Sequence, residues 1–125
     1  MPDNAVEEFA RLLVEHVRDA AIRGCDQDLS PAAGTVTAPR WPQARTEEDL
    51  ALVRAVIPDC VDAAVSQLLL AIDQGLLRLS YTDEGGRRVD LPETGRGELT
   101  GWYLGADGWR GRYSAERFAD DFGDL

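Results

Sequence analysis

The stretch that decides the fold runs from residue 46 to residue 77 and reads TEEDLALVRAVIPDCVDAAVSQLLLAIDQGLL. Thr46 is placed to cap a helix, and three acidic residues follow it, where the first free amides and the positive end of the helix dipole lie. Pro58 cannot complete the helical hydrogen-bond pattern. We therefore expect either a kink at Pro58 or two helical segments that meet there, and we prefer two segments. Gly75 ends the pattern.

Apolar side chains recur in this stretch at the spacing of a helix. The stripe that we expect to face the core consists of Leu50, Val53, Ile57, Val61, Ala64, Leu68 and Ile72. The carboxylates on the opposite side are Glu48, Asp59, Asp62 and Asp73. We expect them to form an acidic ridge that faces solvent. A magnesium site or an acid and base pair is the alternative, but hard cations need oxygen ligands that converge from several elements, and these come from one helix.

The rest of the chain predicts shorter elements. In chain order they are a helix over 3–24, a long loop over 26–45 with a short strand at 34–38, a hairpin over 77–91, a second hairpin over 98–113 with a helix over 98–104 as the weaker alternative, and a helix over 115–122. Together they predict a single α+β domain. An N-terminal helix and the long proline-kinked or split helix pack on a small antiparallel β-meander, and a short helix lies at the C-terminal end.

Composition excludes several functions. The 125 residues include 13 basic residues, all of them arginine, against 23 acidic ones, and the net charge is −10. Without lysine there is no Schiff-base chemistry and no Walker lysine. The acidic balance argues against a nucleic-acid partner, because phosphate contacts need a basic surface. We also expect a cytoplasmic protein, since no apolar run approaches a membrane span and the acidic start does not resemble a signal peptide.

The residue types used in catalysis and metal binding are few. His16 is the single histidine, and it lies at the edge of the apolar stripe of the first helix, where a packed side chain is the expected role. Cys25 and Cys60 are far apart in the chain, which favours buried, reduced thiols over a disulfide framework or a zinc site. We therefore predict no catalytic residue, no metal site and no cofactor.

Aromatic and arginine side chains gather near the C-terminal end. Trp102, Trp109 and Arg110 belong to a group of six such residues within 12 positions, a composition that is common in interface hot spots. We expect this group mainly to pack against the long helix, because large aromatic side chains are usually buried, and a recognition surface is the alternative. Trp41, in the long loop, is either an anchor on the core or a further contact residue.

These observations favour a non-enzymatic interaction protein. The leading hypothesis is an inhibitor or toxin-immunity protein that binds a basic protein partner through Glu48, Asp59, Asp62, Asp73, Trp41, Trp102, Trp109 and Arg110. A small-molecule binding protein or enzyme, with a pocket between the sheet and the 26–45 loop, is the alternative. A homodimer is a third hypothesis. We expect neither nucleic acid nor membrane as a partner. The lysine-free composition, rich in Ala, Arg, Asp and Gly, suggests a bacterial source.

Overall fold

The structure is a computed structural model that describes residues 4–29 and 46–118. In chain order its elements are α1 (Asn4–Leu13), the π-helical turn η1 (Val14–Arg18), α2 (Asp19–Leu29), α3 (Glu47–Asp73), β1 (Ser80–Thr82), β2 (Arg88–Asp90), α4 (Leu91–Gly95), α5 (Leu99–Leu104) and α6 (Trp109–Tyr113). The fold is α+β, as predicted, with a small two-stranded antiparallel sheet beside the helices.

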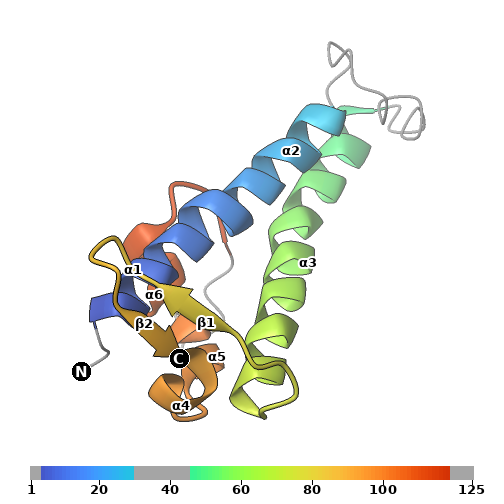
Figure 1. Cartoon of the computed structure of the whole chain (residues 1–125). Helices are drawn as coiled ribbons and strands as arrows, with labels where there is room; N and C mark the ends of the chain where they lie inside the picture. The colour runs from blue at the N-terminus through green and yellow to red at the C-terminus, as the bar shows by residue number, and fades with distance from the viewer. Residues whose placement is uncertain (1–3, 30–45, 119–125) are drawn as a thin grey trace.

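Two long rods determine the shape of the molecule. α1, η1 and α2 follow one another as one rod, and α3 is the other (Figure 1). The rods converge where α2 ends and α3 begins, and they diverge toward the start of α1 (Figure 1). The hairpin and the short helices α4 to α6 lie at the diverging end. This arrangement places the core between α1, the second half of α3 and the short helices.

The core takes residues from every part of the described chain. Its fully buried members include Val6 and Val14 from the first rod, Leu69 and Ile72 from α3, and Trp109 from α6. Phe9 packs edge-on against Trp109 and against Tyr81 of the hairpin, with ring centroids 6.3 and 5.8 Å apart. The hairpin confirms the predicted strands and pairs Tyr81 with Val89.

The π-helical turn changes which side of the first rod is buried. Helical spacing from Val6, Phe9 and Leu13 predicts that Val17 and Ala20 face the core as well, but Val17 is 49% exposed and Ala20 is exposed. A π turn holds an additional residue, so the side chains that follow it are rotated relative to a regular helix. As a result Arg18, Asp19 and Ile22 point inward.

α3 turns a different face to the core from the one predicted. It is a single helix of 27 residues with Pro58 inside it. Of the two expected arrangements, the two separate segments are therefore not observed. Its buried residues are Pro58, Asp62, Val65, Leu69 and Ile72. Most of the predicted stripe lies one position away from this set. Apolar residues occur on all sides of α3, so periodicity alone did not determine which side is buried.

The second predicted hairpin is wrong, because its two strands are the helices α5 and α6. Helix over 98–104, the weaker alternative, is close to what the structure shows. Asp73 explains the outcome for α5, because its carboxylate accepts hydrogen bonds from the amides of Leu99 and Thr100 at 3.0 and 2.9 Å. A carboxylate at this end satisfies free amides and interacts well with the helix dipole, and this overrides the β propensity of the aromatic residues.

Two further predictions concern segments that are only partly described. The loop expected over 26–45 begins later, because α2 continues through Gly24 to Leu29. A glycine inside a helix costs only about 1 kcal/mol, and contacts between α2 and the rest of the fold, such as the ion pair of Asp26 with Arg117, offset this. Residues 30–45, with Trp41 and the expected strand, lie outside the described residues. Of the helix expected over 115–122, the described part, 115–118, is not helical.

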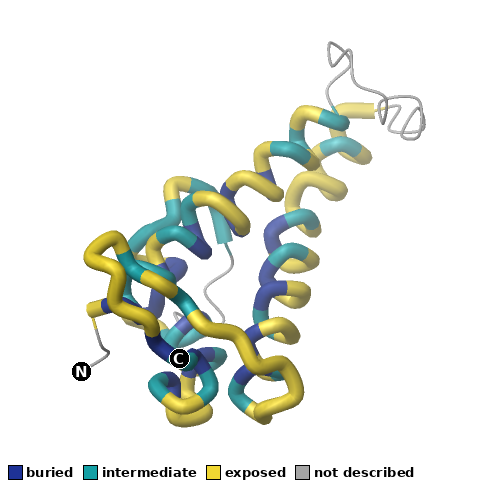
Figure 2. Tube along the Cα trace, in the orientation of Figure 1, coloured by how far each residue is buried: buried dark blue, intermediate teal, exposed yellow. Residues whose placement is uncertain are grey.

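One prediction about membrane spans needs correction. We expected no segment to approach the length and composition of a span, but α3 is 27 residues long and contains an 18-residue window that is apolar enough for one. Only 28% of its most apolar window is buried, so most of α3 is open to its surroundings. Figure 2 shows its buried positions on the side that faces the rest of the fold. The fold is compatible with a soluble protein.

Candidate functional site

Asp62 lies at the centre of a buried network instead of on a solvent-facing ridge. Its carboxylate accepts hydrogen bonds from Arg18 Nε at 2.7 Å, from Arg110 Nη1 at 2.8 Å and from the Tyr103 hydroxyl at 2.6 Å. Arg18 is 0% exposed, Arg110 is 4% exposed and Asp62 is 6% exposed. The network therefore joins the first rod, α3, α5 and α6 through one carboxylate.

A second carboxylate completes this network. Asp19 accepts hydrogen bonds from Arg18 Nη1 at 3.0 Å, from the Ser114 hydroxyl at 2.7 Å and from the amide of Ala115 at 2.8 Å. Two arginines and two aspartates thus balance in charge, as buried ions must. The Phe118 ring lies near both guanidinium groups, 5.5 Å from that of Arg18 and 4.8 Å from that of Arg110.

Asp62 stays ionised to a lower pH than an ordinary aspartate, because its pKa is lowered. Burial alone would raise the pKa of Asp62, but hydrogen bonds from Arg18, Tyr103 and Arg110 outweigh burial and hold the pKa below its usual value. Burial and the hydrogen bond to Asp62 both raise the pKa of Tyr103 above its usual range. A permanently charged and enclosed carboxylate suits a structural role more than acid–base catalysis, which needs a pKa near the working pH. Asp62, predicted to lie on a solvent-facing ridge, is instead buried in this fold.

Asp73 is also engaged inside the molecule. Besides the two amides at the start of α5, its carboxylate accepts a hydrogen bond from the Thr100 hydroxyl at 2.8 Å. Its role is to fix α5 against the end of α3.

Glu48 and Asp59 are the two predicted acidic residues that remain exposed on α3. At 100° per residue they lie on nearly the same side of the helix, and Leu52, which is 67% exposed, lies beside them. We call these three residues the acidic strip. No ion pair joins Glu48 or Asp59 to an arginine in the described part of the chain. The strip is the part of the predicted ridge that stays available to a partner.

A hollow of about 220 Å³ borders this strip. It is lined by Ala55, Pro58, Asp59, Arg117 and Phe118. Arg117 brings a positive charge to the hollow, but both ends of its guanidinium bond Asp26, at 2.8 and 2.9 Å. Asp59 is the carboxylate that remains for an incoming group. We call this feature the Asp59 hollow.

The predicted aromatic and arginine residues do not form one surface. Trp109 is fully buried and Arg110 is bound in the Asp62 network, so neither is open to a partner in this fold. Large aromatic side chains commonly take core positions, and packing prevailed over a recognition surface for Trp109. Trp102 is partly buried and packs at 6.2 Å from Trp109.

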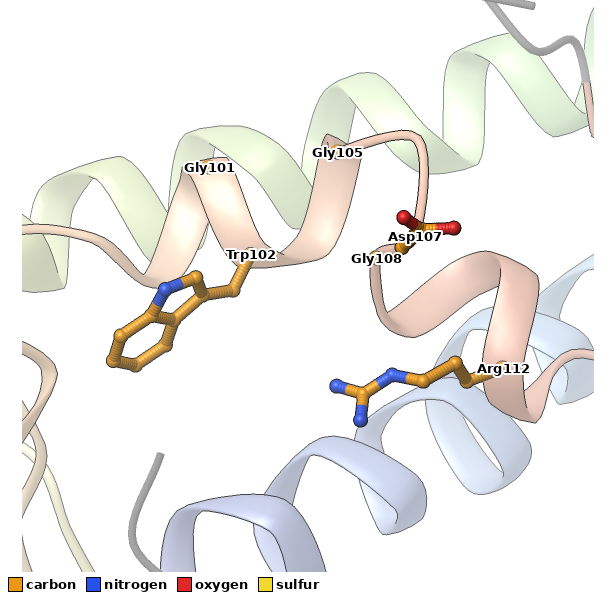
Figure 3. Close-up of a pocket in the computed structure, with 6 residues that line it drawn as sticks. All are labelled: Gly101, Trp102, Gly105, Asp107, Gly108 and Arg112. Atoms are coloured by element: carbon orange, nitrogen blue, oxygen red, sulfur yellow. The ribbon is translucent and has the colours of Figure 1, made fainter. Parts of the chain in front are cut away.

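Trp102 lines a second hollow with Gly101, Gly105, Asp107, Gly108 and Arg112. Figure 3 shows Trp102 on α5 and Arg112 on α6, on opposite sides of this space. Its volume is about 170 Å³, below the roughly 300–1,000 Å³ of most ligand sites. Arg112 already bonds Glu7 at 3.0 Å. Arg110 does not line this hollow.

The remaining reactive side chains are dispersed. Cys25 and Cys60 are both exposed free thiols, which corrects the expectation that they are buried. His16 is exposed as well. No group of three or more His, Cys, Asp or Glu side chains that could hold a metal ion occurs among residues 4–29 and 46–118.

Comparison with known proteins adds no assignment, because no protein-family model, curated protein or solved structure matches the chain. The network residues Arg18, Asp19, Tyr103 and Ser114 were missed by sequence reasoning. One signal was present, since Arg18 and Asp19 are adjacent charged residues within an apolar helix pattern. Their inward rotation depends on the π turn, which no local pattern announced.

Proposed function

We propose that the protein is a non-enzymatic, acidic interaction protein of the inhibitor or immunity type, and that it binds a basic protein partner at the acidic strip and the Asp59 hollow. The observation that carries this proposal is the exposure of Glu48 and Asp59 without an arginine to neutralise them in the described part of the chain. Unneutralised surface carboxylates attract a basic partner and accelerate its approach.

The contrast with other acidic residues supports this choice. In the described chain Glu7 pairs with Arg112, Asp26 with Arg117, and Asp90 with Arg78. The charge excess lies elsewhere, because residues 46–75 hold six carboxylates and one arginine, a net charge of −5. Two of these six, Asp62 and Asp73, are engaged within the fold, as described above. The exposed part of the excess therefore lies on the first half of α3.

The Asp59 hollow has the chemistry to receive an arginine or lysine side chain. Pro58 and Phe118 offer apolar surface to its methylene groups, and Asp59 offers a carboxylate to its charged end. Leu52 lies beside the hollow and can contact an apolar residue of the same partner. A volume of about 220 Å³ fits one side chain better than a whole small molecule.

Binding measurements at several salt concentrations test the proposal. The probes are basic proteins encoded next to the gene and an arginine-rich helical peptide, each titrated against the full chain. We expect the affinity to fall as salt increases and to fall about tenfold in Asp59→Asn, because a charge-assisted hydrogen bond is lost. Asp107→Asn, also at an exposed position, is the matched control and should bind normally. The proposal would be contradicted by an affinity that does not change with salt concentration, by equal affinities of the two variants, or by no binding of any probe.

A further inference from the structure

The outer face of α3 carries an exposed apolar seam. Its positions are Val53, Val56, Cys60, Ala63, Gln67 and Leu70, and all six are exposed. They are separated by alternating steps of three and four residues, which is the spacing of the contact positions of a coiled coil. The seam extends over about 26 Å at the helical rise of 1.5 Å per residue.

This seam lies opposite the buried side of α3. The core residues Asp62, Val65 and Leu69 point to one side of the helix, and the seam points roughly to the other. Val53 and Val56 are 39% and 46% exposed, and Leu70 is 36% exposed. A face of this length that is apolar except at Gln67 usually marks an interface, since scattered apolar residues alone are normal on a surface.

We propose that the seam binds a second copy of this chain, with the two α3 helices antiparallel. A two-fold axis between Val61 and Asp62 then brings each seam position opposite another seam position. Val53 contacts Leu70 of the second copy, and Val56 contacts Gln67 of the second copy. Cys60 contacts Ala63 of the second copy at the centre, where two small side chains allow the helices to approach closely. Such self-complementarity is the requirement for a two-fold interface.

Charge favours the antiparallel arrangement. In a parallel pair the acidic first turns, Glu47 to Asp49, would lie side by side and repel each other. In the antiparallel pair Asp49 meets Gln74 of the second copy, and Asp59 lies beside Ser66 of the second copy. The two helix dipoles also oppose each other. No pair of like charges lies directly opposite in this register.

The same argument selects a second copy over other occupants of the seam. Glu48 lies away from the seam and Asp59 only at its edge, so a basic partner has little charge to meet along the seam itself. The net charge of −10 opposes adsorption on an anionic membrane. It also repels a second copy, so the dimer should strengthen as salt screens this repulsion. The inference therefore stands independently of the proposed function.

The two cysteines provide a test within the native chain. Both thiols are exposed in one protomer, but only Cys60 lies in the seam. We expect mass measurements to show a dimer that dissociates on dilution. We also expect iodoacetamide to alkylate Cys60 more slowly as protein concentration rises, while the rate at Cys25 stays constant. A monomer at all concentrations, or a dimer in which Cys60 reacts as fast as Cys25, would overturn the proposal.

Substitutions at the centre of the seam test the register. Ala63→Glu places a carboxylate at an apolar contact and should weaken self-association about a hundredfold, whereas Ala106→Glu, at an exposed position outside the seam, should leave it unchanged. Adding Cys60→Arg to Ala63→Glu should restore the dimer, because the new charges then face each other across the two-fold axis. Parallel helices would bring like charges together, so failure of this rescue counts against the antiparallel register.

The same alkylation assay discriminates between occupants. The native chain is mixed with the arginine-rich peptide in one experiment and with vesicles of anionic or neutral lipid in another. Protection of Cys60 in the protein alone supports the dimer. Protection that appears only with the peptide or only with vesicles would overturn the assignment of a second copy.

Discussion

Replacing Asp62 by asparagine tests whether the buried network holds the two rods and the short helices together. The substitution keeps the shape of the side chain and removes its charge. Asp62 Oδ1 accepts from Arg18 Nε and Oδ2 accepts from Arg110 Nη1, so an amide nitrogen in place of either oxygen leaves one of the two arginines facing an NH2 group instead of an acceptor. The guanidinium groups cannot lose their protons and cannot reach water, because both arginines are buried.

The expected loss of stability is large for a domain of this size. Removing one partner from a buried ion pair costs about 3–5 kcal/mol, since an uncompensated charge stays behind. Domains of this kind unfold with a free energy of about 5–15 kcal/mol. Asp62→Asn should therefore remove at least about a fifth of the total stability. Asp59→Asn, on the same helix but exposed, should change stability by no more than about 0.5 kcal/mol.

Urea denaturation followed by circular dichroism measures both variants in the same way. A third variant, Arg110→Met, added to Asp62→Asn should recover part of the loss, because it removes one unpaired charge and leaves apolar volume. The reasoning is refuted if Asp62→Asn costs less than about 1 kcal/mol, or if Arg110→Met fails to compensate for it.

Two further predictions concern acid stability and the cap of α5. The pKa values of Asp26 and Asp62 are lowered in the fold, the first mainly by its hydrogen bond from Arg117 and the second by hydrogen bonds that outweigh burial. The stability that these two aspartates contribute is therefore present above the unfolded-state pKa of about 3.9, and it is lost as pH falls through their lower folded-state pKa values. Urea midpoints measured at a series of pH values should fall over this acid range. Asp62→Asn should make the midpoint depend less on pH. Asp73→Ala removes three hydrogen bonds at the start of α5 and should lower the free energy of unfolding by about 1–2 kcal/mol. Hydrogen exchange at the amide of Thr100 should become faster. An unchanged exchange rate would contradict the capping role of Asp73.

Local patterns were enough to predict some parts of this fold. The first hairpin followed from alternation and a glycine turn, and its register depends on residues only 6 to 10 positions apart. Thr46 was correctly predicted to cap α3, and its hydroxyl accepts a hydrogen bond from the amide of Asp49 at 2.9 Å. Both features depend on interactions between near neighbours in the chain.

The orientation of α3 could not be obtained in this way. Asp62 was assigned to solvent because it lies opposite the apolar stripe that helical spacing predicts for α3. Its arginine partners are 44 and 48 positions away, and a single sequence does not indicate which distant charges will meet. The same holds for α5, because the carboxylate of Asp73 that caps it comes from 26 positions earlier. Of the candidate site, Glu48 and Asp59 were found from sequence, and the hollow beside Asp59 was not.

The π-helical turn at Val14–Arg18 also bears on how the length of this chain can change. Such a turn accommodates one residue more than an α-helical turn, and Val17 within it is half exposed and packs little. Deleting Val17 should convert the turn to regular α-helix while Arg18 and Asp19 keep their direction. This short segment can therefore absorb a one-residue change in length that would, elsewhere in a helix, rotate every later side chain by about 100°.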